Sequence, residues 1–371
     1  MIPVCEPLLG GREAEYVLDC LKTNWISSRG KYVDAFEKEF AKYCGCKYGI
    51  CTTSGTTALH LAMAALDLKP GDEVIVPAFT MIASAFAIIY VGAKPVLVDA
   101  DPETWNMDAT KVAAKVTSRT RAIMPVHIYG HPCDMDPILE VAKGHNLRVV
   151  EDAAEVHGAR YKGRKAGSLG DMACFSFYAN KIITTGEGGM VVTNDDKLAT
   201  RAQLLKDLAF TPDRRYLHRE LGFNFRMTNI QAAIGLAQLE RADELVEMRR
   251  RNARLYNERL REVRGIGLPP EKEWAKNVYW MYSITVEDDY GLSRDDLMVD
   301  LRKRGVDSRS FFIGMHRQPV FLDMGLFRGE SYPVTDELAR KGLYLPSSSG
   351  LTVEQIDQVC RAVKEIQAAA R

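Results

Sequence analysis

The sequence lacks the features that mark several classes of protein. Its 371 residues contain 49 lysines and arginines against 49 aspartates and glutamates, so no global basic field is available to hold nucleic acid or an anionic membrane. The eight cysteines show no paired CxxC spacing, and we expect reduced, buried thiols rather than a zinc site or any other metal centre. Any phosphate must therefore be bound by local groups.

Signals for export or for a membrane span are also missing. The first residues, MIPVCEPLLG, contain no basic stretch followed by an apolar one, and the longest apolar segments are interrupted well before a bilayer-spanning length. We therefore expect a cytoplasmic protein. With 46% hydrophobic residues, the chain can bury a large core and divide into two or three domains.

The first 230 residues alternate short apolar strand candidates with amphipathic helix candidates. This pattern is typical of a mainly parallel sheet covered by helices, in which ligands collect at the carboxyl ends of the strands. The strand candidates are residues 48–53, 73–78, 94–99, 122–127 and 147–152.

Residues 229 to about 263 lose strand character and favour a helix that connects two domains. The segments beyond it, among them VYWMYSITV and the helical SRDDLMVDLRKRG, favour a smaller α+β domain. We expect a large domain over residues 1–245 and a small domain over residues 246–371.

The segment CTTSGTTALHLAMAAL reads as a strand, a glycine-containing turn and a helix. The backbone N–H groups of Gly55 and Thr56 at that helix N-terminus would suit a phosphate. Taken alone, the same pattern also fits an ordinary helix cap by Ser54 or Thr56.

The segment LRVVEDAAEVHGA places two acids at the end of an apolar strand. Glu151 and Asp152 point to opposite sides of that strand, so they do not form a paired acid and base. Asp152 could bind the nitrogen of a pyridine ring, with the small Ala154 leaving room for the ring. The alternative is an aspartate that caps the next helix.

The segment GDMACFSFYANKIITTGEGGMVVTN carries a lysine between two apolar, strand-like runs. Desolvation would lower the pKa of Lys181 and leave a nucleophilic amine that can form an imine. The alternative is an edge lysine that discourages aggregation. GEGGM lacks the GxGxxG spacing and the following helix of a dinucleotide site.

Four motifs together resemble the DegT/DnrJ/EryC1/StrS family of sugar aminotransferases, in the family's order and along nearly the whole chain. They are SGTTALHLA, EDAAEVHGA, SFYANKIITTGEGGM and GFNFRMTNIQAAIGLAQLE. Four coincident motifs are more specific than any one, so the combination outweighs the local alternatives. The resemblance implies the aspartate aminotransferase-like type I fold, with a large three-layer αβα domain and a smaller α+β C-terminal domain.

The resemblance also implies pyridoxal 5'-phosphate as the cofactor. Lys181 would hold it as an imine, and Asp152 would pair with the pyridine nitrogen. Glu155, where many relatives carry glutamine, would approach the ring hydroxyl. The family's phosphate-binding positions fall on Gly55, Thr56 and Ser176.

A homodimer with shared active sites is implied as well, because Asn224 would reach the phosphate from a second subunit.

One position departs from the family pattern. Relatives usually place an aromatic residue where this chain has Met81, and that residue stacks on the pyridine ring. Methionine can pack on a ring through its polarizable sulfur, and Phe79 is an alternative stacking residue.

The implied reaction has two halves. L-Glutamate would convert the cofactor to pyridoxamine phosphate, which would then aminate the 4-keto group of a nucleotide-linked 4-keto-6-deoxy sugar, GDP-4-keto-6-deoxymannose being our first expectation. Such products serve polysaccharide biosynthesis, O-antigen included. Alternatives are a UDP- or dTDP-linked sugar, or a non-catalytic cofactor-binding regulator. Arg226 and His316 are candidate substrate contacts, although a structural salt bridge and an uninvolved loop histidine would fit them equally.

Overall fold

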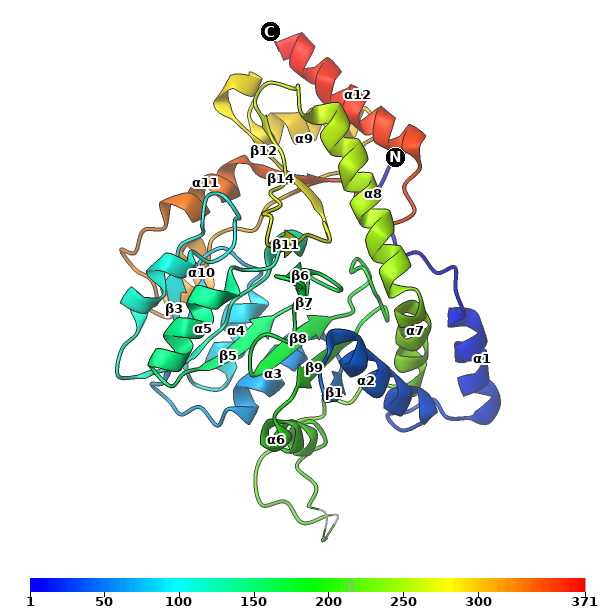
Figure 1. Ribbon diagram of the computed structural model, residues 1–371, viewed down its shortest axis with the longest axis vertical. Coiled ribbons are helices and arrows are strands. Elements are labelled where there is room, and N and C mark those ends of the chain that lie inside the picture. Colours follow the sequence, from blue (N-terminus) through cyan, green and yellow to red (C-terminus); the bar gives the residue numbers. More distant parts are fainter. Residues whose placement is uncertain (212, 215, 371) are drawn as a thin grey trace.

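A seven-stranded sheet forms the centre of the molecule (Figure 1). The computed structural model describes residues 1–211, 213–214 and 216–370. The strands are β1 (Tyr48–Thr52), β2 (Glu73–Pro77), β3 (Lys94–Val98), β4 (Thr120–Ile123), β5 (Arg148–Asp152), β8 (Met172–Ser176) and β9 (Gly189–Thr193). Their order is β1-β9-β8-β5-β4-β2-β3, and β9 runs antiparallel to both of its neighbours while the other adjacent pairs are parallel.

All five strand candidates of the sequence are confirmed as β1 to β5. One of them ends early, because β4 stops at Ile123 whereas the candidate segment extends to residue 127. Pro125 has no N–H to donate to a neighbouring strand, and Val126 pairs with Asp152 only as an isolated bridge.

Helices cover both faces of this sheet and make a three-layer arrangement. Within β2, Val74 and Val76 pack in the apolar cluster of α3, α4 and α6, whereas Ile75 packs in the cluster of α5 on the other face. A strand buried on both faces reads as a continuous apolar run, which is the pattern of EVIVP. These helices are α1 (Glu13–Thr23), α2 (Lys31–Cys44), α3 (Gly55–Ala65), α4 (Ala83–Tyr90), α5 (Met135–Gly144), α6 (Asp196–Lys206) and α7 (Asn229–Glu240).

The helix predicted from residue 229 to about residue 263 is in fact two helices, α7 and α8 (Ala242–Leu260). They are separated at Arg241, whose backbone angles (φ −112°, ψ 11°) leave the helical region. In Figure 1, α8 runs from beside the large sheet to the C-terminal part of the chain.

The C-terminal part contains a four-stranded antiparallel sheet, ordered β10-β12-β14-β13, with helices packed on it. Its apolar cluster joins the second half of α8 to β12, α9 and α12. Met315 and Phe321 pack instead in the cluster of α3 and α4. The domain boundary at residue 245 stays a prediction. The elements here are β10 (Ile266–Gly267), β12 (Tyr282–Val286), β13 (Arg309–Ser310), β14 (Gly342–Leu345), α9 (Arg294–Lys303), α10 (Pro319–Asp323), α11 (Pro333–Lys341) and α12 (Val353–Ala370).

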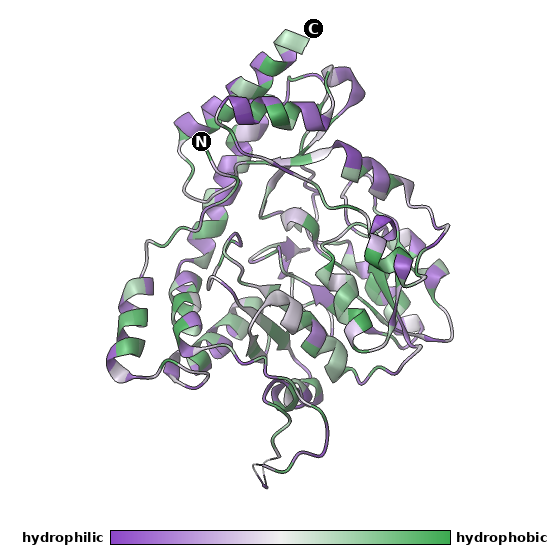
Figure 2. Ribbon diagram, turned by 180° about the vertical axis from the view of Figure 1, so that it is seen from behind, coloured by the Kyte–Doolittle hydropathy of each residue, from purple (hydrophilic) through white to green (hydrophobic). Residues whose placement is uncertain are grey.

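Short elements complete the fold. A small three-stranded sheet, ordered β11-β6-β7, lies between the two larger ones. Figure 2 shows that the strands of the large sheet are mainly hydrophobic, whereas the outer helices carry hydrophilic residues as well. The remaining elements are β6 (Arg160–Tyr161), β7 (Arg164–Lys165), β11 (Ala275–Lys276), η1 (Ala109–Lys111), η2 (Ala113–Lys115), η3 (Ile128–Gly130), η4 (Asp288–Tyr290) and η5 (Met315–Arg317).

All eight cysteines are free thiols, and all except the partly exposed Cys5 and Cys46 are buried. Among the described residues, no group of three or more His, Cys, Asp or Glu side chains is placed to hold a metal ion. No helix in the part of the chain that the structure describes is long and apolar enough to cross a membrane.

Candidate active site

A cavity of about 390 Å³ lies where the carboxyl ends of β5 and β8 meet the N-terminus of α3. Ligands of open α/β sheets bind at this edge. The structure brings eight of the predicted site residues together around this cavity. They are Gly55, Thr56, Met81, Asp152, Ala154, Glu155, Ser176 and Lys181.

The N-terminus of α3 forms one end of the cavity. Ser54 caps the helix through a capping box with Thr57, so the local alternative of an ordinary cap is also correct. The amides of Gly55 and Thr56, the first two helical residues, have no acceptor within the helix and are available to an anion. A Cβ on Gly55 would lie 2.6 Å from Cβ of Ser176, so only glycine lets α3 approach β8 this closely.

Asp152 ends β5 and faces into the cavity. Its Oδ2 accepts a hydrogen bond of 2.7 Å from the hydroxyl of the buried Ser84, and Oδ1 accepts one of 3.2 Å from the amide of Ala154. The hydroxyl of Thr80, which lines the cavity, lies 3.0 Å from that of Ser84. Burial raises the pKa of Asp152. A cationic ring nitrogen beside this carboxylate would favour its ionised form, so the position suits such a nitrogen.

Glu151 points to the opposite side of β5, as the strand alternation predicts. Its carboxylate accepts hydrogen bonds of 2.7 to 2.8 Å from the amides of Gly167, Leu169 and Gly170. His127 also contacts it, at 2.9 Å from Nε2 to Oε2. Because the amide of Cys133 donates to Nδ1 of His127, the proton lies on Nε2 and is donated to Glu151. Glu151 therefore fixes the loop after β7.

Lys181 lies in a turn between β8 and β9, where its amide donates to the carbonyl of Tyr178 at 2.9 Å. The side chain is only 9% exposed, and burial lowers the pKa of its amine. Nζ lies 3.5 Å from the centre of the Trp280 ring and 3.7 Å from Oε1 of Glu155. The edge-lysine alternative is therefore wrong, because this amine points into the cavity.

Aromatic residues form much of the remaining lining of the cavity, and the sequence analysis did not predict them as site residues. They are Tyr178, Trp280, Phe312 and Tyr344. Tyr178 precedes Lys181 by three residues, but the other three come from segments far from Lys181 in the sequence, so no local pattern could have pointed to them. Trp280 is held by a hydrogen bond of 2.9 Å from Nε1 to the carbonyl of Asn180. Met81 also lines the cavity and is 46% exposed. Phe79 is buried against Tyr129 and Phe311 and does not line the cavity, so the structure does not support Phe79 as the stacking residue.

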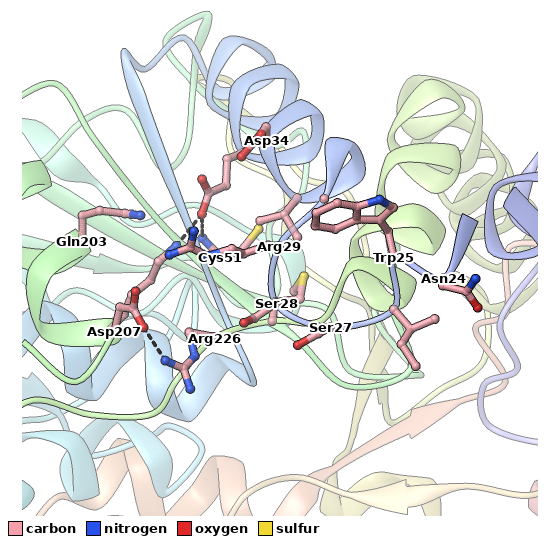
Figure 3. Close-up of a pocket in the computed structure, with 16 residues that line it drawn as sticks. Asn24, Trp25, Ser27, Ser28, Arg29, Asp34, Cys51, Gln203, Asp207 and Arg226 are labelled. Carbon is pink, nitrogen blue, oxygen red and sulfur yellow. Dashed lines mark hydrogen bonds and ion pairs between the residues drawn. The ribbon is translucent and has the colours of Figure 1, made fainter. Parts of the chain in front are cut away.

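Three predicted residues do not line this cavity. Asn224 is exposed and pairs through its backbone with Asp207. Arg226 lines a second cavity of about 780 Å³, where it forms an ion pair with Asp207 (Figure 3). Residues 24–30, between α1 and α2, line the same cavity.

His316 is buried outside the first cavity as well. Its Nε2 lies 3.0 Å from Oδ1 of Asp336, and its ring lies 5.0 Å from that of Tyr332. Burial lowers the pKa of His316. In this chain the histidine therefore has a structural partner, and its substrate contact stays a prediction.

The residues around the first cavity fit pyridoxal phosphate. Free helix amides beside Ser176 suit a phosphate, the buried carboxylate of Asp152 suits a protonated ring nitrogen, and the amine of Lys181 suits the carbonyl carbon. Oδ1 of Asn180, which lines the cavity, is buried without a hydrogen-bond partner among the described residues. Such an atom indicates room for a polar ligand.

Known proteins resemble the chain over nearly its whole length. The model of the DegT/DnrJ/EryC1/StrS aminotransferase family matches residues 7–364. GDP-perosamine synthase of Caulobacter vibrioides is 50% identical over 366 residues, and that of Escherichia coli O157:H7 is 44% identical over 367 residues, with 98% of both chains covered in each case. The crystal structure of S. venezuelae DesV has a TM-score of 0.89 at 36% identity, covering 96% of this chain and 94% of that one.

These likenesses confirm the predicted type I fold and pyridoxal phosphate as the cofactor. The chain therefore belongs to the DegT/DnrJ/EryC1/StrS aminotransferase family and is a pyridoxal-phosphate-dependent sugar aminotransferase.

Proposed function

We propose that this enzyme transfers the amino group of L-glutamate to the 4-keto group of GDP-4-keto-6-deoxymannose. The buried amine of Lys181, in one cavity with Asp152 and the N-terminus of α3, is the observation that carries the transaminase chemistry. The identity of 50% and 44% to two GDP-perosamine synthases supports the nucleotide and the sugar.

The cofactor, when bound, supplies an electron sink for the carbon that loses its proton. Asp152 would keep the ring nitrogen protonated by opposing its positive charge. Gly55, Thr56 and Ser176 would hold the phosphate, and Met81 and Ala154 would lie against the ring. These residues would orient the cofactor, and none of them would transfer a proton.

Lys181 would bind the cofactor covalently and would transfer the protons of the reaction. Its amine would bind the cofactor's carbonyl carbon until the amino group of L-glutamate displaces it. Nζ would then move a proton from the α-carbon of the donor to the cofactor and, in the second half of the reaction, move a proton from the cofactor to C4 of the sugar. The rings of Trp280 and Tyr344 would keep water away from this amine.

We also propose a homodimer with shared sites. Asn224 lies outside the cofactor cavity of its own chain and is exposed, so it is available to a second subunit. Leu217 and Leu221, in the segment just before Asn224, are 41% and 91% exposed, and two exposed apolar side chains in one segment favour an interface. Arg226 and His316 remain proposed substrate contacts, and a cytoplasmic location remains the expectation.

Incubation with ¹⁵N-labelled L-glutamate and a panel of nucleotide-linked 4-keto-6-deoxy sugars tests the proposal. We expect mass spectrometry to find label in the GDP-linked product at a far higher rate than in UDP- or dTDP-linked ones. The Lys181→Ala protein serves as the control without the reacting amine. Faster labelling of a UDP- or dTDP-linked sugar would replace the proposed nucleotide, and no labelled sugar at all would refute the aminotransferase proposal.

A further inference from the structure

The cofactor cavity holds more negative than positive charge. Among the described residues, its buried lining includes the carboxylates of Asp152 and Glu155 and a single amine, that of Lys181. Asp152 is held by Ser84 and by the amide of Ala154, and it has no ion pair within 4.0 Å among the described residues. Asp152 would therefore be matched by the cationic ring nitrogen of the bound cofactor, and Glu155 is left as the partner of Lys181.

The position of Glu155 is fixed by the backbone. The amide of Tyr129 donates a hydrogen bond of 2.7 Å to Oε2, so the other oxygen, Oε1, is turned toward Nζ of Lys181 at 3.7 Å. The ring of Trp280 lies against Nζ as well. The amine thus has a carboxylate oxygen on one side and an aromatic face on another, and Glu155 itself is only 5% exposed.

Burial makes a proton transfer between these two groups far easier than in water. In water a lysine holds its proton about six pH units more tightly than a glutamate does. Desolvation disfavours both charged forms, so it raises the pKa of Glu155 to about 7 and lowers the pKa of Lys181. The charged pair and the neutral pair are therefore much closer in free energy here.

We propose that Glu155 is a second catalytic group, which takes the proton of Lys181 when that amine attacks a carbonyl and returns it when the amine is released. One N–H bond at Nζ breaks and one O–H bond at Oε1 forms, so the step needs no other reactant. This proposal rests on the proposed function, in which Lys181 provides the attacking amine. A glutamine at this position could not perform it, because an amide does not titrate in this range.

Other titratable groups face the pair from neighbouring elements. Tyr129 and Tyr344 face Glu155, and burial raises the pKa of Tyr129 well above its ordinary value and that of Tyr344 to about 12. On the lysine side, burial lowers the pKa of His157 to about 3, so this imidazole stays neutral. Cys5 lies nearby and donates from its thiol to the carbonyl of Asn180. Asp152 also faces the pair with its carboxylate.

Difference infrared spectroscopy can detect the proton on Glu155 while pyridoxal phosphate is added to the cofactor-free protein. We expect the carbonyl band of a newly protonated carboxylic acid in the wild type and its loss in Glu155→Gln. Glu187→Gln is the matched control, because Glu187 also lines the cavity but forms no ion pair with Lys181. That control should keep the band.

The pH dependence of covalent attachment gives a second readout. An ionised Glu155 raises the pKa of Lys181, so its removal should shift the midpoint of the attachment rate to lower pH, by about one to three units. Glu187→Gln should leave the midpoint unchanged. The proposal fails if the wild type attaches the cofactor at Lys181 without the band, or if Glu155→Gln retains both the band and the midpoint. Absence of any borohydride-stable attachment to Lys181 in the wild type would instead refute the proposed function.

Discussion

Lys181 carries two tasks in the proposed reaction, covalent binding of the cofactor and movement of protons. Lys181→Ala should fold, because it removes one side chain at a cavity and creates little empty volume in the core. It should form no borohydride-reducible link to pyridoxal phosphate, and its turnover should be undetectable. Absorption spectra before and after borohydride treatment, followed by thermal unfolding, measure both effects.

Lys206 provides the competing site for this prediction. It is as buried as Lys181, with a side chain 7% exposed, but Nζ lies 2.6 Å from Oε1 of Glu37 and is held in that ion pair. Peptide mapping of the reduced wild-type protein should find the cofactor on Lys181 alone. Cofactor on Lys206, or on any other lysine, would overturn the site assignment.

Replacement of the neighbouring acids Glu151 and Asp152 should have different effects: loss of Asp152 should lower turnover, and loss of Glu151 should lower stability. Asp152→Asn keeps the shape but removes the charge that opposes the ring nitrogen, so turnover should fall by about 100- to 1000-fold with little loss of stability. Glu151→Ala leaves several buried donors without an acceptor and should cost about 3 to 5 kcal/mol in the free energy of unfolding. Steady-state kinetics and urea unfolding separate the two effects.

Glu151 should also make the stability of the protein depend on pH. Burial alone would raise the pKa of Glu151, but its hydrogen bonds from His127 and from backbone amides outweigh burial and lower it. The stabilisation by Glu151 is therefore present above its unfolded pKa and is lost as pH falls through the folded value. Unchanged acid unfolding in Glu151→Ala would show that these hydrogen bonds contribute nothing.

At the scale of elements, the contact of α3 with β8 shapes the phosphate end of the cavity. Gly55→Ala would place a Cβ 2.6 Å from that of Ser176, so α3 must move away. We expect a loss of about 1 to 3 kcal/mol in stability and much weaker cofactor binding. The control is Gly144→Ala at the end of α5, where an added Cβ meets nothing within 4 Å and stability should stay the same or rise by up to about 1 kcal/mol.

Calorimetry and a fluorescence titration with pyridoxal phosphate measure these two glycine variants. Equal cofactor affinity in Gly55→Ala and the wild type would show that binding of the phosphate does not depend on this helix terminus.

The elements themselves could be predicted from the sequence, since β1 to β5 follow from apolar runs between helix patterns. The break at Arg241 could not, because nothing in the residue types marks where a long charged helix changes direction.

At the scale of the whole molecule, a shared active site predicts complementation. Asn224→Ala and Lys181→Ala proteins should each be nearly inactive, but mixed dimers should regain one intact site of the two, because the two residues would serve that site from different chains. Light scattering should first show that the wild type is at least a dimer. Heterodimers without recovered turnover, or a stable wild-type monomer with full cofactor occupancy, would refute the shared site.

The sequence by itself determined the alternation of strands and helices, the burial of the central strands and the motif positions around Lys181 and Asp152. These features depend on neighbours in the chain, through strand and helix periodicity and through turn chemistry. The opposite fates of Glu151 and Asp152 follow from strand alternation alone, and the structure confirms them.

Only the tertiary structure decided which distant side chains meet. Trp280 reaches Lys181 across about a hundred positions of the chain, and the hydroxyl of Ser84 reaches Asp152 across 68 positions. Packing likewise buried Phe79 away from the cavity and paired His316 with Asp336. Local residue patterns record which face of an element is apolar, but not which element will cover that face, so contacts between elements are decided only when the core packs.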